Sequence, residues 1–351
     1  MILFIFKFFI TNIVFSVILC SIFTRFNESG RYSNSELLLY SLGLGPAFTT
    51  LLLYYSFLIL PHRSNIFYLL LIAAVYFLIA VIGRKSFRRI FCDVENSIKK
   101  IFTVKGTTFS KIEHIALIVI ICVPLIVFLF FYLTKILPQP LIGHDVLIHA
   151  NRGKMLFDEK SLMVAQYASG LTAAPSFSLL LKWEELLNFL FKAKSDLYFK
   201  SANAYYGLLI FSIQYYWVAK QNKWVAVLAI LALLSGLSFF TAFLVEPQID
   251  LYRIFFLSIS FIWLAYAVKE KDFLSLLMFG IFSGFTAFSH RIGVVMAVIN
   301  CIVFLITVDS NFKTRMIKTV ILALLILAFG GDHYIFDLIW GGSTWIKPLS
   351  Y

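Results

Sequence analysis

The chain has 351 residues, of which 61% are hydrophobic and only 14% are charged. Soluble domains carry roughly a quarter charged residues, so this composition excludes a water-soluble fold and indicates a helical membrane protein whose surface is covered by lipid. The net charge of +12 does not indicate nucleic-acid binding, because Lys and Arg accumulate in the cytoplasmic loops of membrane proteins.

Apolar runs long enough to cross a bilayer recur along the chain. A helix needs about 20 apolar residues to span the hydrocarbon core, and this criterion predicts an all-α, polytopic membrane protein with about ten transmembrane helices. We expect a three-span N-terminal region with a basic loop (1–113) and a transmembrane core (114–351). The expected spans are Ile2–Phe23, Leu37–Leu60, Ile66–Gly83, Ile115–Leu137, Leu197–Ala219, Trp224–Val245, Leu251–Val268, Phe273–Ser289, Ile292–Val308 and Met316–Gly330.

The basic residues between these spans predict the orientation of the chain. The segment Arg84–Lys111 contains eight Lys and Arg residues, which is a strong cytoplasmic signal. Alternation from this segment places most other basic loops on the same side, and the short loops of the opposite side hold only Arg63, Arg253 and Arg291. The long polar segment 138–195 is therefore expected on the non-cytoplasmic side.

Two helices are expected in this outer segment. Asp145–Phe157 is typical of a short amphipathic helix with Asp145, His149 and Arg152 on one face. Ser176–Phe191 is apolar but carries three charges, so we expect it to lie along the membrane surface. Its charges, Lys182, Glu184 and Glu185, are expected to form a solvated face with an i, i+3 pair.

Polar residues from three sequence-distant segments fall on the expected outer side, and we expect them to converge on one site at the membrane boundary. The sequence leaves simpler interpretations open, among them helix capping by Asp145, an interfacial anchor at His290 and Arg291, and a solvated turn at Glu246 and Asp250. Asp145 and His149 have the spacing of two metal ligands, but no clear third ligand follows, so the metal remains unknown. The candidate site residues are His144, Asp145, His149, Arg152, Glu246, Asp250, His290 and Arg291.

The pattern between about Ile115 and Val308 resembles the GT-C superfamily of membrane glycosyltransferases. Members of that family open the first outer loop with an acidic residue after a span, as GHDVLIHANRGKMLFDE does with Asp145. Juxtamembrane helices and a Pro-led apolar helix follow, which AAPSFSLLLKWEELLNFLF resembles with Pro175. EPQID resembles a second acidic outer loop with Asp250. FGIFSGFTAFSHRIG resembles the Gly-rich helix that ends in a basic residue, with His290 and Arg291 in place of the more usual Lys.

This resemblance implies an inverting transfer of a sugar from a polyprenyl-phosphate donor to a glycan, glycolipid or protein acceptor. The reaction would take place on the outer face of a bacterial inner (plasma) membrane, in contact with membrane lipids. Asp145 is the expected base, and Asp250 would orient the acceptor or hold Arg291. Arg291 and His290 would bind the donor phosphate, with His149, Arg152, Glu246 and His144 as accessory residues. No cofactor is required with certainty, and a divalent metal stays open.

Two other classes of protein also fit the composition. A lipid-linked glycan transporter or flippase should show ionisable residues at mid-membrane and broken helices in matching positions. An enzyme similar to O-antigen ligases or polymerases should carry paired arginines in and around the outer loop, where this chain has only Arg152.

Overall fold

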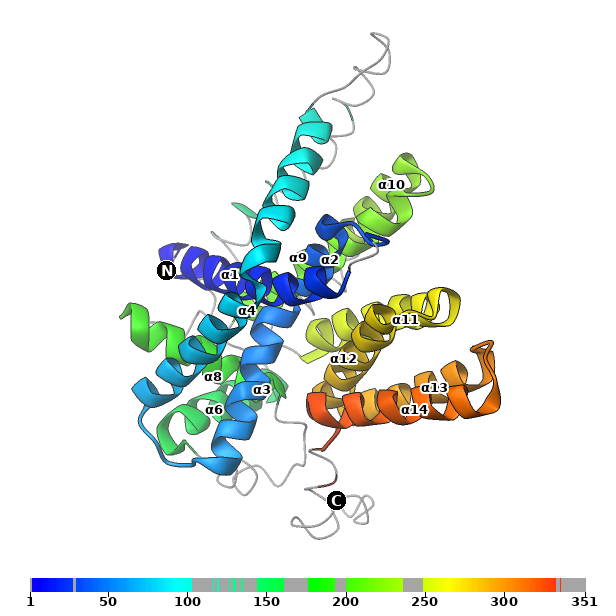
Figure 1. The fold of residues 1–351 in the computed structure, drawn as a ribbon. Helices are drawn as coiled ribbons and strands as arrows, with labels where there is room; N and C mark the ends of the chain where they lie inside the picture. Colours follow the sequence, from blue (N-terminus) through cyan, green and yellow to red (C-terminus); the bar gives the residue numbers. More distant parts are fainter. Residues whose placement is uncertain are drawn as a thin grey trace. The chain divides into compact units, whose positions relative to one another are not determined.

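In the computed structural model, every regular element within the described part of the chain is helical. The structure describes residues 2–27, 30–102, 144–160, 176–192, 200–235 and 249–332, together with residue 335 and isolated positions between 116 and 134. Figure 1 shows the helices in chain order. Their bounds are α1 Ile2–Phe26, α2 Asn34–Ser41, α3 Leu44–Ile59, α4 Asn65–Phe102, α6 His144–Glu159, α8 Ser176–Phe191, α9 Ser201–Ala219, α10 Lys223–Ser235, α11 Ile249–Glu270, α12 Phe273–Ser289, α13 Arg291–Thr307, α14 Phe312–Ile326 and the π-helix η4 Leu327–Gly331.

Within these residues the predicted spans are helical except at Leu42 and Gly43, which break the span predicted at Leu37–Leu60, and at the terminal residues Leu60 and Val308. Among the described residues, four helices are long and apolar enough to cross a membrane, or five if the bent pair α2–α3 is counted as one span. This is compatible with a multi-pass membrane protein, but it does not reach the predicted ten spans. Helices α12 and α13 are apolar but have 17 residues each, which gives about 26 Å of helix against a hydrocarbon core of about 30 Å. The predicted span 115–137 lies almost entirely outside the described residues.

The basic segment that follows the third predicted span, residues 84–111, begins as a continuation of helix α4 and not as a loop. Helix α4 continues without interruption from Asn65 to Phe102, so the first 19 residues of the predicted cytoplasmic segment are helical. The buried residues Ser86 and Ile90 lie four apart, which is the spacing of one helical face, and the segment has no Pro to end the helix.

The chain divides into two compact units. The first consists of Met1–Pro46, Leu69–Ala150 and Glu184–Leu251, and the second of Ala47–Tyr68, Asn151–Trp183 and Tyr252–Tyr351. The predicted division between residues 113 and 114 falls in a segment outside the described residues, and it stays a prediction.

The first unit contains the break between α2 and α3, which are bent by 47°. A break frees backbone carbonyls that membrane interiors cannot solvate. Here hydroxyl groups from other helices donate to them. The bonds run from Ser16 and Tyr205 to the Leu42 carbonyl (2.8 and 2.7 Å), from Tyr206 to that of Gly43 (3.0 Å) and from Tyr76 to that of Gly45 (2.7 Å).

Loops predicted to share the cytoplasmic side contact one another within each unit. In the first, the Asn34 amide donates to the Asp93 carboxylate (2.6 Å), and the Lys220 ammonium lies 3.1 Å from the Glu36 carboxylate. In the second, the Lys271 ammonium lies 3.0 Å from the Asp309 carboxylate. The alternation of the spans across the membrane stays a prediction.

Helices α12, α13 and α14 pack together in the second unit (Figure 1). Glycines on α12 allow the close approach, since a Cβ at Gly280 would lie 2.7 Å from the Leu325 Cβ, and one at Gly284 would lie 2.6 Å from the Phe329 Cβ. Gly293, three residues into α13, is in the tightest position, because a Cβ there would collide with the Thr286 carbonyl oxygen of α12.

Candidate functional site

The two helices predicted in the outer segment are present as α6 and α8. Helix α6 begins one residue before the predicted start and extends to Glu159, and α8 has the predicted bounds. They pack at Gly153, where an added Cβ would lie 2.7 Å from the Leu181 Cβ and 3.4 Å from the Lys182 backbone nitrogen. The segment therefore contains a packed helix pair.

The turn between α3 and α4 is bound to the end of α6. The backbone N–H of His62 donates to the Lys160 carbonyl (2.9 Å), and its Nδ1 lies 3.0 Å from the Glu159 carbonyl oxygen. The Asn65 amide donates to the Phe157 carbonyl (3.3 Å). This turn and the outer segment are predicted on the same side of the membrane, and that orientation stays a prediction. His62 and Asn65 were not among the predicted site residues, because their only sequence signal is a short polar turn between two apolar runs.

Lys182 is fully buried, so the predicted solvated face on α8 is wrong. Its ammonium donates to the Asn65 Oδ1 (2.6 Å) and the Phe157 carbonyl (3.4 Å). It also lies 4.4 Å from the ring centroid of Phe157, 5.7 Å from that of Phe57 and 5.9 Å from that of Tyr68. Aromatic faces and carbonyl oxygens replace the hydration of a buried cation, and these partners come from distant parts of the chain.

Glu184 and Glu185 are buried as well, at 0% and 6% exposure. One carboxyl oxygen of Glu184 accepts a hydrogen bond from the Ala202 backbone N–H (2.8 Å), and the other has no partner among the described residues. Burial raises the pKa of the Glu184 carboxyl well above its ordinary value of 4.5. The protonated form is therefore favoured far above that pH.

Arg152 is the second buried cation of the helix pair, with only 6% of its surface exposed. Its Nε and Nη2 have no hydrogen-bond partner in the part of the chain that the structure describes. Burial lowers the pKa of the guanidinium, but an arginine keeps its charge at physiological pH. Arg152 was predicted as an accessory residue, and in the described part of the chain two of its buried guanidinium nitrogens lack a hydrogen-bond partner.

For most of the other candidate residues the structure describes the position of the backbone but not the side chain. His144 and Asp145 are the first two residues of α6 and His149 lies on its second turn, but these three side chains lie outside the described residues. Asp250 is in the first turn of α11, and Glu246 lies outside the described residues. Asp145 and Asp250 belong to the first unit.

His290 and Arg291 lie in the second unit, at the junction of α12 and α13. His290 is the N-cap of α13, and its Nδ1 accepts a hydrogen bond from the Ile292 backbone N–H (3.1 Å). Arg291 is the first residue of α13, and its side chain is outside the described part. The meeting of the three outer segments in one cavity therefore stays a prediction.

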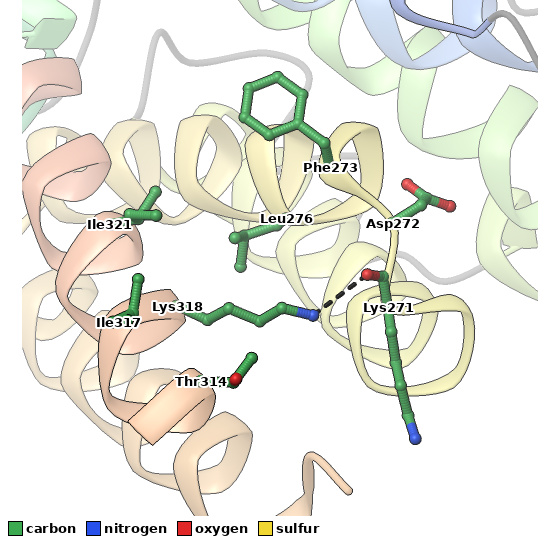
Figure 2. Close-up of a pocket in the computed structure, with 8 residues that line it drawn as sticks. All are labelled: Lys271, Asp272, Phe273, Leu276, Thr314, Ile317, Lys318 and Ile321. Carbon is green, nitrogen blue, oxygen red and sulfur yellow. Dashed lines mark hydrogen bonds between the residues drawn. The ribbon is translucent and has the colours of Figure 1, made fainter. Parts of the chain in front are cut away.

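The pocket that the structure describes contains none of the predicted site residues, and the side chains of the predicted metal ligands Asp145 and His149 lie outside the described residues. Among the described side chains, no group of three His, Cys, Asp or Glu residues could hold a metal ion. A hollow of about 380 Å³ lies between the start of α12 and α14 (Figure 2), lined by Lys271, Asp272, Phe273, Leu276, Thr314, Ile317, Lys318 and Ile321. Across it the Lys318 ammonium donates to the Lys271 carbonyl (3.1 Å). His290 follows the opposite end of α12, about 25 Å away along the helix axis.

Comparisons of the chain with protein-family models, with curated proteins and with solved structures found no match.

Proposed function

We propose that this protein is a multi-pass membrane glycosyltransferase, with about ten spans arranged as in the GT-C superfamily. In this proposal it moves a sugar from a polyprenyl-phosphate donor to a glycan, glycolipid or protein acceptor on the non-cytoplasmic face of a bacterial inner membrane. The observation that carries the proposal is the folded outer segment. Helices α6 and α8 pack on each other at Gly153 and are bonded to the α3–α4 turn. The proposed base, Asp145, is the second residue of α6.

The proposed reaction is an inverting displacement at the anomeric carbon of the donor sugar. The bond from this carbon to the phosphate oxygen breaks, a bond to the acceptor oxygen forms, and Asp145 takes the proton of the acceptor. The departing lipid phosphate gains negative charge, which Arg291 and His290 would stabilise, and Asp250 would orient the acceptor. The remaining polar residues, His144, His149, Arg152 and Glu246, would contact the donor or the acceptor.

Transport is supported less well, for a reason that lies in the α2–α3 break. Broken helices in transporters use their freed carbonyls to coordinate ions. The freed carbonyls of Leu42, Gly43 and Gly45 already accept hydrogen bonds from Ser and Tyr hydroxyls. This break is therefore better explained as a packing feature than as an ion site.

The test is donor turnover by the purified full chain in vesicles. The vesicles receive a panel of polyprenyl-phosphate sugars and a membrane-lipid extract as acceptor, and mass spectrometry follows the release of polyprenyl phosphate. Asp145→Asn should abolish release, while Asp158→Asn, an exposed position of the same helix, should leave it unchanged.

Three other results of this experiment would change the proposed mechanism or function. Normal release by Asp145→Asn removes that residue from the mechanism. If the protein turns over only diphosphate-linked donors, the result favours an enzyme similar to O-antigen ligases or polymerases. Movement of intact donor across the vesicle membrane without release would replace the transferase by a transporter.

A further inference from the structure

The guanidinium of Arg152 is buried, and the described residues supply no hydrogen-bond partner for two of its three nitrogens. Its exposure is 6%, and within the described residues neither Nε nor Nη2 has a hydrogen-bond partner. The exposed acids of the same helix, Asp158 and Glu159, lie six and seven residues further along, about 9 to 10 Å along the helix axis. The third acid of this helix, Asp145, lies seven residues before Arg152, and its side chain is outside the described residues. A buried charge that lacks a partner is strongly unfavourable, and proteins normally supply a counter-charge.

Lys182, a buried cation of the same unit, is surrounded by partners that stabilise its charge. Its ammonium is equally inaccessible, but it has two oxygen acceptors and three aromatic rings around it. The two cations are carried by helices that pack together at Gly153. The protein therefore supplies hydrogen-bond partners for the Lys182 ammonium, whereas the open donors of the Arg152 guanidinium are available to a bound ligand.

We infer that Arg152 binds the phosphate group of a lipid-phosphate ligand. Three donor nitrogens in a planar fork match a phosphate better than any neutral group, and such pairs are often bidentate. Helix α6 belongs to the segment expected at the outer membrane boundary, where the anion available to a buried site is the head of a lipid. The identity of this ligand as the glycosyl donor rests on the proposed function.

The spacing of Asp145 and Arg152 along α6 also suits a joint role in the proposed reaction. Residues seven apart lie on nearly the same face of an α-helix, with a rise of about 10 Å between them. Positions 145 and 152 of α6 have this spacing. A base at the first position and a phosphate contact at the second would stand on one helix face, which suits a reaction that needs both.

The inference predicts opposite stability effects for the two buried cations. Arg152→Met should leave the thermal midpoint of the ligand-free full chain unchanged or raise it, because it removes an uncompensated charge. Lys182→Met should lower the midpoint, because it removes the donor to the Asn65 Oδ1 and one of the two donors to the Phe157 carbonyl. Exposed Lys154→Met, on α6, is the control for loss of a positive charge.

Binding is measured by native mass spectrometry and thermal shift with geranylgeranyl monophosphate as the probe. Wild type should bind it and gain in midpoint, Arg152→Met should bind at least tenfold more weakly, and Arg152→Lys should retain part of the affinity. Geranylgeraniol, which lacks the phosphate, should not distinguish wild type from Arg152→Met. Inorganic phosphate and phosphatidylglycerol are tested separately, to show whether the isoprenoid tail or a phospholipid head supplies the ligand.

Two results would overturn the inference: equal binding of the probe by wild type and Arg152→Met, or a marked loss of stability in ligand-free Arg152→Met, as for a guanidinium with protein partners. If Arg152→Met does not fold, Arg152→Gln is measured in its place, and misfolding of both variants counts against the inference. Failure of the proposed function has a different signature. Donor turnover would then be absent in wild type while Arg152-dependent binding of the lipid phosphate persists.

Discussion

The Lys182 ammonium lies 2.6 Å from the Asn65 Oδ1, and the two residues are 117 positions apart in the chain. This bond ties α8 to the first residue of α4, and the aromatic rings of Phe57, Tyr68 and Phe157 surround the ammonium. The α3–α4 turn and the outer helix pair are thus held together by a buried cation.

Loss of either partner of this bond should destabilise the second unit. We expect Lys182→Met and Asn65→Leu each to cost about 1–3 kcal/mol. The first removes the donor to the half-buried Asn65 Oδ1, and the second removes the nearer of the two oxygen acceptors of the buried Lys182 ammonium. The double variant should cost less than the sum of the two, with a coupling of about 0.5–3 kcal/mol. Unfolding of the four proteins in mixed micelles measures this cycle, and additive effects would mean that the bond does not form.

Glu184 should make stability depend on pH. The pKa of its carboxyl is raised by burial from 4.5, so above that pH the unfolded chain releases this proton while the folded chain retains it. The contribution of the group is therefore largest below pH 4.5 and falls as pH rises. Glu184→Gln should be more stable than wild type at pH 8 and similar to it near pH 4.5, whereas Glu159→Gln, at an exposed position, should match wild type at both. Unfolding at the two pH values measures this, and a variant less stable at pH 8 would contradict it.

His290 should contribute to stability as a helix cap independently of any ligand. His290→Ala removes the acceptor of the Ile292 N–H and should cost about 0.5–2 kcal/mol, whereas His290→Asn should retain most of the stability because Asn is a favoured N-cap. Activity then separates the two roles. If His290 also binds the donor phosphate, His290→Asn should fold normally but lose turnover, and full turnover in that variant would leave capping as its role.

Gly293 should not accept even a methyl group. A Cβ at this position collides with the backbone oxygen of Thr286, which no rotamer change can relieve, so Gly293→Ala should force α13 away from α12 and cost about 1–3 kcal/mol or more. Gly30 provides the contrast, because nothing lies within 4 Å of its Cβ direction and its φ is +63°. Gly30→Asn should be nearly neutral, since Asn tolerates the left-handed region. Thermal midpoints of the two variants test the comparison.

Cys92 offers a native probe of the predicted orientation. It is exposed and lies on the extension of α4 that the basic residues assign to the cytoplasmic side. A membrane-impermeant maleimide should label it in inside-out vesicles and not in right-side-out vesicles. Glu159→Cys, on the outer helix α6, should show the reverse pattern when Cys92 is replaced by Ser. Labelling of both positions from one side would refute the alternation of spans.

Local patterns in the sequence predicted the helices well. Helices α8 and α12 have the predicted bounds, and α11 and α13 deviate from theirs by at most two residues. The reason is that helix formation and apolar length depend on residues a few positions apart. The uninterrupted course of α4 to Phe102 was missed because a run of basic residues marks a side of the membrane without marking the end of a helix.

Hydrophobic run length and helical periodicity are local properties, so the sequence alone indicated a helical, apolar chain and predicted both ends of α6, α8, α11, α12 and α13 to within two residues. Only the tertiary structure decided which charges are buried and which of them are compensated. Lys182 and Arg152 are both cations on short outer helices, and no local pattern distinguishes them. Their difference depends on Asn65, Phe57 and Tyr68, which reach Lys182 across more than a hundred residues of chain.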